Sequence, residues 1–325
     1  MEKKVILQNL LLLSVSMLLM AAVVEIGVRL AKTELHPPSM FMGQREGVSY
    51  SLTPNFHGQT STGIPLDINS LGLRDREYSL ERRDGTFRIV VLGDSVTFGQ
   101  AVKQEDSYPE QLEVLLNKES DTEFEVINAG VSGYNTHEEL LFLRDTAIQY
   151  NPDMIIVGYA LNDLGMIHPV FRGNDMKSRF LFHTKEFVKH RLNSYSYITR
   201  TGQAFIYNLG KHNVTINENR YMPGSRAWDI TLDSMKGIEE ISEEHNAQLV
   251  VALLPDLRFV NGSLDTYPFT GFHDAIAEQF QEIGAETVIL LPAFDGYTRQ
   301  EVTVSATDAH PNKDGHELIA KALQR

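Results

Sequence analysis

The sequence contains no cysteine among its 325 residues. This absence excludes disulfide bonds, metal sites built from thiolates, and a cysteine nucleophile. Any catalytic or metal-binding site must therefore use other side chains.

Clusters of basic residues are also missing. Lys and Arg total 29 against 43 Asp and Glu, which leaves a formal net charge of −14. Surfaces that bind nucleic acid need grouped Lys and Arg to contact phosphates, so the composition argues against a nucleic-acid partner. With 42% hydrophobic and 22% charged residues, the chain has the composition of a globular protein with a solvated surface and a real core.

Long apolar runs are scarce, and only one is long enough to cross a bilayer. It extends from Val5 to Val24, 20 residues without a charge, and as a helix it would be about 30 Å long. Lys3 and Lys4 precede it, while the charges that follow roughly cancel, so the N-terminus is expected in the cytoplasm.

We therefore expect residues 1–32 to form a cytoplasmic tip and a single-pass transmembrane signal-anchor. The membrane would be a partner of this helix, and the rest of the chain would be extracytoplasmic, in the periplasm or at the cell surface. A cleaved signal peptide is the alternative, but no clear small-x-small cleavage site closes the apolar run.

After the apolar run, an irregular segment is followed by a regular alternation of expected strands and helices. Residues 33–84, with "HPPS" and "STGIP", are predicted to form an irregular linker and lead-in with short strands. Over residues 85–325, short β-rich runs alternate with amphipathic stretches, and the expected strands are 87–93, 123–130, 153–159, 248–255 and 286–292. These runs are almost continuously Val, Ile and Leu, which predicts an α/β fold: a three-layer α/β/α sandwich with a five-stranded parallel sheet.

An insertion at about 165–226 interrupts this alternation with aromatic and basic residues. It leaves the sheet at the carboxyl end of a strand, where open α/β folds bind ligands. A helical cap over the site is the favoured interpretation, and an elaborated surface is the alternative.

Polar residues stand directly after several expected strands. Ser95 follows the first strand, Gly133 the second and Asn162 the third, while Asp308 and His310 precede the last expected helix. The carboxyl ends of parallel strands lie at one edge of a sheet, so we expect these residues to converge there.

These residue types fit nucleophilic catalysis by serine. A serine hydroxyl becomes reactive when an imidazole accepts its proton, and a carboxylate fixes the tautomer of that imidazole. Ser95, His310 and Asp308 would take these catalytic roles, and the i, i+2 spacing in an extended segment lets Asp308 lie beside His310. The oxyanion hole would use the backbone N–H groups of Ser95 and Gly133 and the side-chain amide of Asn162.

The segments that carry these residues resemble the SGNH hydrolases, also called the GDSL esterase/lipase family. The similar blocks are "GDSVTFG" with Ser95, "NAGVSGYNT" with Gly133, "GYALND" with Asn162, and "DAHPN" with Asp308 and His310. They come in the family's order and cover roughly residues 87–325. Two departures are "GDSV" in place of "GDSL" and an Asp–His spacing of two residues where three is more frequent.

The resemblance implies a flavodoxin-like SGNH hydrolase fold and a serine esterase that acts on an acetyl or another short acyl ester, without a cofactor or a metal. Its substrate would be an acylated small molecule or glycan. One alternative is an O-acetyltransferase or deacetylase acting on a cell-surface polysaccharide, because acyl transfer to a sugar uses the same residues. A lower alternative is a non-catalytic glycan-binding protein on the same fold.

Some of these residues also have structural interpretations. Asp94 or Ser95 in "GDS" is a suitable N-cap at a strand-to-helix turn. In "HPNKDGHE", Asp314 is predicted to cap the last helix, with Glu317 completing a capping box and His316 in the first turn. A metal site formed by Asp308, His310, Asp314 and His316 is the less favoured alternative.

Overall fold

The computed structural model describes residues 8–9, 12–17, 19–20, 22–23, 26, 41–42, 48, 50–60, 63–164 and 225–324. The described residues from Phe41 onward belong to one compact unit. The predicted insertion lies outside the described residues up to residue 224, and the predicted transmembrane segment and linker lie partly outside them. Within the ranges just given, no helix combines the length and the apolar character that a membrane crossing requires.

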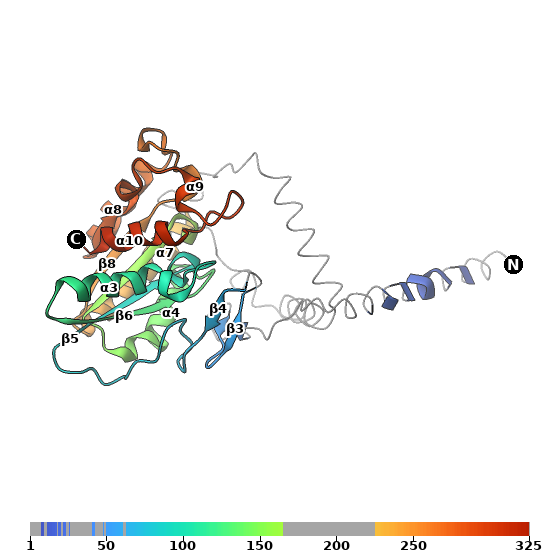
Figure 1. Ribbon diagram of the computed structural model, residues 1–325, viewed down its shortest axis with the longest axis horizontal. Coiled ribbons are helices and arrows are strands. Elements are labelled where there is room, and N and C mark those ends of the chain that lie inside the picture. Colours follow the sequence, from blue (N-terminus) through green and yellow to red (C-terminus); the bar gives the residue numbers. More distant parts are fainter. Residues whose placement is uncertain are drawn as a thin grey trace. The chain divides into compact units, whose positions relative to one another are not determined.

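A parallel β-sheet forms the centre of this unit (Figure 1). Its five strands are β5 (Thr86–Gly93), β6 (Glu123–Gly130), β7 (Met154–Ala160), β8 (Gln248–Leu254) and β9 (Glu286–Ile289). Their order across the sheet is β6-β5-β7-β8-β9, and every neighbouring pair is parallel. The predicted five-stranded parallel sheet is confirmed.

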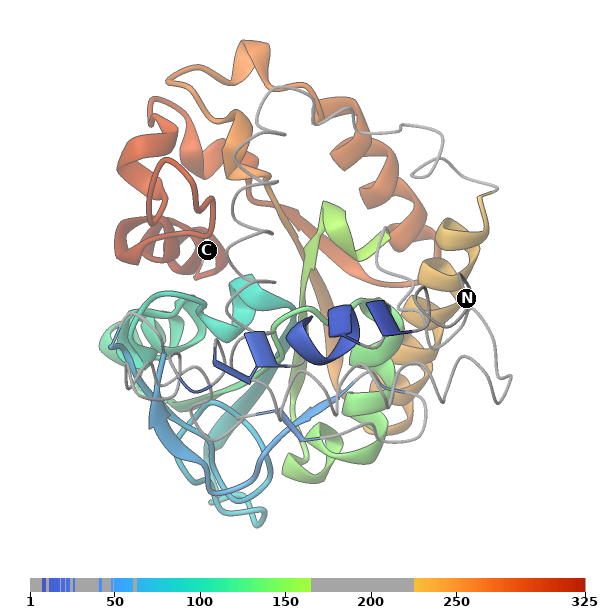
Figure 2. The same ribbon diagram turned by 90° about the vertical axis from the view of Figure 1, so that its right-hand side faces the viewer.

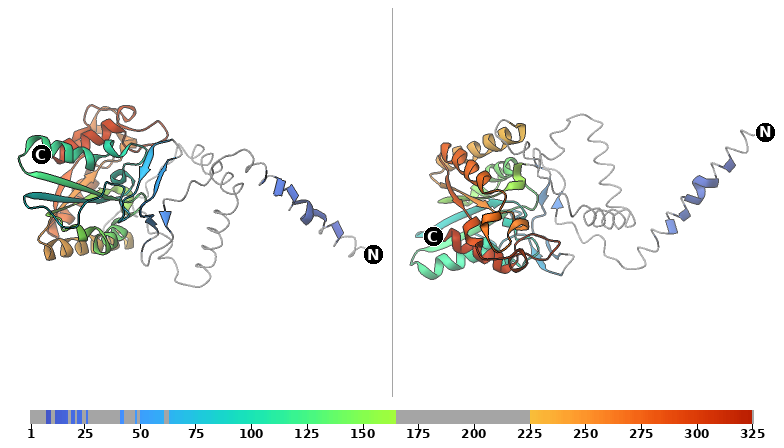
Figure 3. Two further views of the ribbon diagram at one scale, coloured as in Figure 1. Left: turned by 60° about the horizontal axis from the view of Figure 1, so that its bottom comes forward. Right: turned by 90° about the horizontal axis from the view of Figure 1, so that it is seen from above.

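Helices cover both faces of this sheet (Figure 2 and Figure 3). One face carries α3 (Tyr108–Glu119) and α10 (Lys313–Leu323), and the other carries α4 (Thr136–Asp145), α7 (Arg226–Glu244) and α8 (Thr270–Glu282). Along β5, Ile89 and Val91 pack with the first group, whereas Val90 and Leu92 pack with the second. Successive side chains of a strand point to opposite faces, so both faces of β5 are buried and the predicted three-layer sandwich is confirmed.

The other helices within the described residues are short. They are α2 (Ser95–Phe98), α9 (Arg299–Val302), and the 3-10 helices η1 (Gln104–Asp106), η2 (Ala147–Tyr150), η3 (Leu161–Leu164), η6 (Leu257–Phe259), η7 (Leu264–Thr266) and η8 (Leu291–Phe294). Of these, α2 and η3 directly follow β5 and β7, at the edge of the sheet where the site residues are expected.

The lead-in segment contributes to the same core. Its strands form two antiparallel pairs, β1 (Phe41–Met42) with β2 (Ser51–Leu52) and β3 (His57–Gln59) with β4 (Pro65–Asp67). Its buried apolar side chains join the cluster between the sheet and α4, α7 and α8: Val48, Leu52, Phe56, Leu66, Ile68 and Leu73. Burial of these side chains holds the lead-in against the rest of the unit.

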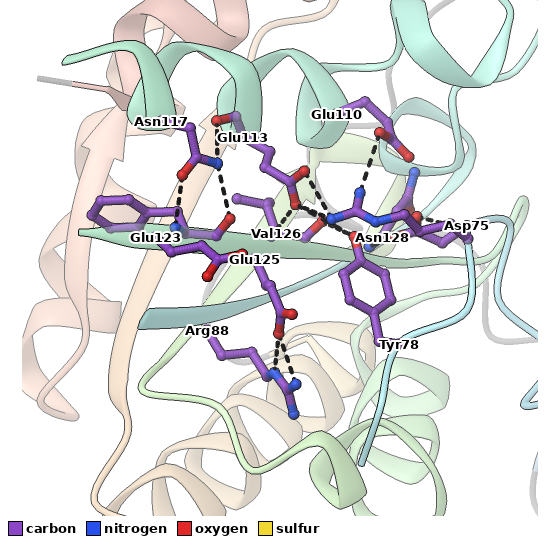
Figure 4. Close-up of polar contacts among 12 residues, drawn as sticks. Asp75, Tyr78, Arg88, Glu110, Glu113, Asn117, Glu123, Glu125, Val126 and Asn128 are labelled. Carbon is purple, nitrogen blue, oxygen red and sulfur yellow. Dashed lines mark hydrogen bonds and ion pairs between the residues drawn. The ribbon is translucent and has the colours of Figure 1, made fainter. Parts of the chain in front are cut away.

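A buried ion pair adds a polar link between the lead-in and the sheet. Arg88 of β5 is 1% exposed, and its Nε donates to Glu125 of β6 at 2.7 Å (Figure 4). Its remaining N–H groups donate to the carbonyls of Tyr150 and of Ser79 in the lead-in, at 2.6 and 2.9 Å. A buried guanidinium is tolerated when its N–H groups are satisfied in this way.

Three glycines lie in one row across the sheet. Gly93 of β5 is paired with Gly130 of β6 on one side and with Gly158 of β7 on the other. A Cβ atom would lie 2.5 Å from the backbone nitrogen of Phe98 if added at Gly130, 2.0 Å from Thr97 Oγ1 at Gly93, and 2.4 Å from Tyr108 Oη at Gly158. The missing side chains therefore allow α2 to rest directly on the ends of the three strands.

We expect Gly130→Ala to destabilise the protein. The added Cβ would meet a backbone atom at 2.5 Å, which cannot rotate aside. Overpacking of this kind should lower the free energy of unfolding by about 1–3 kcal/mol, measured by urea denaturation. Gly271→Ala is the control, because no heavy atom lies within 4 Å of its added Cβ and alanine favours helix α8. Equal stability of the two variants would contradict a close contact between α2 and Gly130.

Candidate active site

Ser95 is the first residue of α2, immediately beyond the end of β5. The preceding residue, Asp94, is the N-cap: its Oδ1 accepts the backbone N–H of Val96 at 2.8 Å. Gly99 ends the helix in the left-handed conformation, with φ of 77°. Asp94 therefore has the capping role expected of this turn, while the half-buried Ser95 is presented at the carboxyl edge of the sheet.

The structure brings the side chains of Ser95, His310 and Asp308 into contact. His310 Nε2 lies 2.9 Å from Ser95 Oγ, and His310 Nδ1 lies 2.6 Å from Asp308 Oδ1. A carboxylate only accepts hydrogen bonds, so in a neutral imidazole with these contacts Nδ1 carries the proton and Nε2 can accept the hydroxyl of Ser95.

The short spacing between Asp308 and His310 also has a local explanation. Asp308 Oδ1 accepts the backbone N–H of His310 at 3.1 Å in addition to the ring Nδ1–H. The carboxylate thus closes a tight turn with the residue whose imidazole it contacts. Two residues of separation are sufficient for this contact.

Asn312 holds the loop that carries His310. Its Oδ1 accepts the N–H of Gly315 at 2.9 Å, which makes it the N-cap of α10. Its Nδ2 donates to the carbonyls of Glu301 and Thr303, at 2.8 and 3.2 Å. An amide can accept and donate at once, so Asn312 caps the helix and fixes the loop together.

The prediction that Asp314 caps the last helix is therefore wrong. The helix begins at Lys313, so Asp314 lies in its first turn and is exposed. His316 is completely buried, and its Nδ1 accepts the backbone N–H of Tyr108 at 3.2 Å. Burial, with the nearby Arg74 and His310, lowers the pKa of His316 to about 3, so its ring is neutral.

The residues expected to form the oxyanion hole follow three neighbouring strands. Ser95 follows β5, Gly133 follows β6 with φ of +85°, and Asn162 lies in η3 after β7. Among the described residues, no acceptor pairs with the backbone N–H of Ser95 or of Gly133. The Asn162 side chain, the third expected donor, lies outside the described part of the structure.

Arg74 is a positioning residue that the sequence does not reveal. It is buried, and its guanidinium donates to the carbonyls of Phe98, Gly99 and Val102 at 2.9, 2.6 and 2.8 Å. These carbonyls lie at and just beyond the C-terminal end of α2, where a positive charge is favourable. The sequence around Arg74 contains no motif that would indicate a contact with α2.

Two buried acids that interact electrostatically with Asp94, the residue before Ser95, are a second feature that the sequence does not reveal. Glu139 of α4 is 1% exposed, and Asp163 of η3 is 4% exposed. Within the described part of the chain, neither oxygen of Glu139 and not Oδ1 of Asp163 has a hydrogen-bond partner. Burial raises the pKa of both carboxyls well above the usual range. The negative charge of Asp94 adds to this effect, as do Glu138 beside Glu139 and Glu139 beside Asp163.

We expect the stability of the protein to fall with rising pH because of these acids. The pKa of Glu139 is raised only in the folded state, so above its ordinary value of 4.5 the folded protein holds a proton that the unfolded chain releases. Glu139→Gln cannot titrate. Its melting temperature relative to the wild type should therefore increase between about pH 5 and about pH 8, measured by thermal denaturation.

The matched control is Glu119→Gln, at the exposed end of α3. Its melting temperature should follow that of the wild type in parallel across the same pH series. A parallel curve for Glu139→Gln as well would mean that Glu139 is ionised in the folded protein.

Comparison with known proteins supplies the family. The chain matches the model of the GDSL-like Lipase/Acylhydrolase family over residues 91–318. None of the curated proteins matches the sequence. Among solved structures, the chain is similar to the lipase Lip_vut3 from a goat rumen metagenome, with 16% identity over 73% of this chain and 95% of that one and a TM-score of 0.44. It is also similar to a catalytic mutant of the acetylxylan esterase Axe2 from Geobacillus stearothermophilus, with 11% identity over 73% and 92% of the two chains and a TM-score of 0.45.

The assignment rests on the family model, which covers well over half of the chain and includes the segments of Ser95, Gly133, Asn162, Asp308 and His310. The chain belongs to the GDSL-like lipase/acylhydrolase family and is an ester-hydrolysing enzyme.

Proposed function

We propose that this enzyme is a serine esterase in which Ser95 is the nucleophile, His310 the general base and Asp308 the group that orients the imidazole. One observation carries the proposal: the contact of 2.9 Å between Ser95 Oγ and His310 Nε2, continued by the contact of 2.6 Å between His310 Nδ1 and Asp308. A hydroxyl, an imidazole and a carboxylate in this order are the requirements for activating a serine.

In the proposed reaction, His310 Nε2 takes the proton as Ser95 Oγ attacks the ester carbonyl. The resulting imidazolium is stabilised by Asp308, and the backbone N–H groups of Ser95 and Gly133, with the Asn162 amide, would donate to the oxyanion. The alcohol then leaves with the proton from His310. Water attacks the acyl-enzyme by the same route and releases the acid.

We propose an acetyl or another short acyl ester of a small molecule or glycan as the substrate, as the sequence resemblance implies. If a sugar hydroxyl replaces water in the second step, the same residues give an O-acetyltransferase. The two outcomes differ in their products: incubation of an aryl acetate with a polysaccharide acceptor yields free acetate in the first case and acetylated sugar in the second.

Ser95→Ala should abolish both the hydrolysis of an aryl acetate and labelling by a fluorophosphonate. The matched control is Ser234→Ala, because Ser234 Oγ also contacts a histidine, lying 3.3 Å from His137 Nδ1. Ser234 is buried in α7, and its hydroxyl donates to the carbonyl of Ile230 at 2.6 Å. We expect full labelling of the control, and labelling of Ser95→Ala at the wild-type level would refute the assignment of Ser95.

We further propose that the uncharged run Val5–Val24 anchors the enzyme in a membrane, with its N-terminus in the cytoplasm and the hydrolase domain outside. Support comes from the length of the run and from Lys3 and Lys4 before it. The full-length protein should remain in the membrane pellet after alkaline carbonate extraction, and added protease should digest the hydrolase domain of intact spheroplasts. Recovery of a soluble protein lacking residues 1–32 would instead identify a cleaved signal peptide.

A further inference from the structure

We propose that Tyr50 is a positioning residue for the oxyanion hole, which deepens the proposed function and rests on it. The hydroxyl of Tyr50 donates a hydrogen bond to the carbonyl oxygen of Ser132. That carbonyl belongs to the same peptide unit as the N–H of Gly133, one of the proposed oxyanion donors. Tyr50 thus acts on the donor through the opposite side of a single peptide bond.

The planarity of the peptide unit makes this contact effective. In a trans peptide the C=O and N–H groups point in opposite directions, so a hydrogen bond that holds the oxygen also sets the direction of the hydrogen. The loop needs such a restraint, because Gly133 has φ of +85° and glycine has access to many other conformations.

The space at Gly133 is matched to the Tyr50 hydroxyl. A Cβ atom added at Gly133 would lie 2.7 Å from Tyr50 Oη. The hydroxyl therefore occupies the space that any larger residue would fill. Two properties of this position therefore favour glycine: its positive φ and the lack of space for a Cβ atom.

Tyr50 is itself held by the loop that it contacts. The hydroxyl of Tyr134 donates to the backbone carbonyl of Tyr50 at 2.5 Å, and the two rings lie 5.8 Å apart at an angle of 48°. Tyr134 is buried and packs edge-on against Phe142 of α4. The two tyrosines therefore tie the lead-in and the loop after β6 together in both directions.

The hydroxyl also has an electronic effect. A donor on the carbonyl of an amide polarises its N–H and strengthens the hydrogen bond that the N–H donates. This requires a protonated hydroxyl, and burial, with Glu138 and Asp94, raises the pKa of Tyr50 above its ordinary value. The hydroxyl of Tyr50 is therefore protonated, and can donate, at any pH below its ordinary pKa of 10.0.

Tyr50 lies outside residues 91–318, which match the family model. Its role therefore belongs to the lead-in of this chain. The oxyanion loop of the enzyme is supported by a segment that precedes the hydrolase family region.

The test is Tyr50→Phe, which keeps the ring and removes the donor. Loss of an oxyanion donor itself lowers kcat by about 100-fold or more, so an indirect effect should lower kcat on an aryl acetate roughly 10-fold, with KM within about twofold. A second readout is the ratio of the kcat values for the aryl acetate and its thionoacetate analogue. Sulfur accepts hydrogen bonds weakly, so weakening the hole should reduce the rate on the oxygen ester more and lower this ratio.

Tyr78→Phe is the matched control. Tyr78 is also a lead-in tyrosine whose hydroxyl donates to a backbone carbonyl, that of Val126 in β6 at 3.0 Å (Figure 4). It contacts none of the proposed site residues, so kcat and the substrate ratio should match the wild type. Melting temperatures of both variants report any general loss of stability.

The outcomes separate the two proposals. A fall in kcat together with a lower ratio for Tyr50→Phe supports the positioning role. Unchanged kcat, or equal losses on both substrates, overturns it while leaving the nucleophile assignment intact. Failure of the proposed function itself would appear in Ser95→Ala, as activity or fluorophosphonate labelling that persists at the wild-type level.

Discussion

The position of Ser95 depends on a place in the sheet where three adjacent strands carry no side chain. Gly130, Gly93 and Gly158 share one register across β6, β5 and β7. A Cβ atom at any of them would collide with α2 or with Tyr108. Because these Cβ atoms are missing, the helix can rest against the sheet, and its first residue lies at the strand ends. This close approach depends on available space, because protein interiors are close-packed.

From this helix a buried chain of contacts extends toward the histidine loop. Thr97 Oγ1 lies 2.7 Å from Tyr108 Oη, and the backbone N–H of Tyr108 donates to His316 of α10. Asn312 caps the same helix and fixes the loop of His310. Ser95 and His310, 215 positions apart, are thus placed by elements that contact one another through the core.

The lead-in completes this arrangement from outside the region that matches the family. Arg74 holds the C-terminal end of α2, Asp75 accepts the N–H of Asn128 in β6 at 2.7 Å, and Tyr50 contacts the loop after β6. The buried acids Glu139 and Asp163 add a cost in stability, since within the described part of the chain both oxygens of Glu139 and Oδ1 of Asp163 lose their hydration without gaining a hydrogen bond. Their raised pKa values favour the neutral form, which in the proposed reaction opposes the negative charge of the oxyanion less than a carboxylate would.

The alternation of apolar strands with amphipathic helices was sufficient to predict the sheet, its parallel direction and the three layers, because local periodicity reports which faces are buried. The motifs likewise pointed to Ser95, His310 and Asp308, whose side chains lie within hydrogen-bonding distance of one another in the structure. The cap of α10 was misassigned to Asp314, because Asn312 is favoured by two carbonyls, those of Glu301 and Thr303, that lie before it in the chain and reach it only through the folded loop. The roles of Arg74, Tyr50 and Glu139 could not be read from sequence either. Each depends on residues far away in the chain, and only tertiary packing decides whether an arginine, a tyrosine or a helical glutamate faces solvent or is buried.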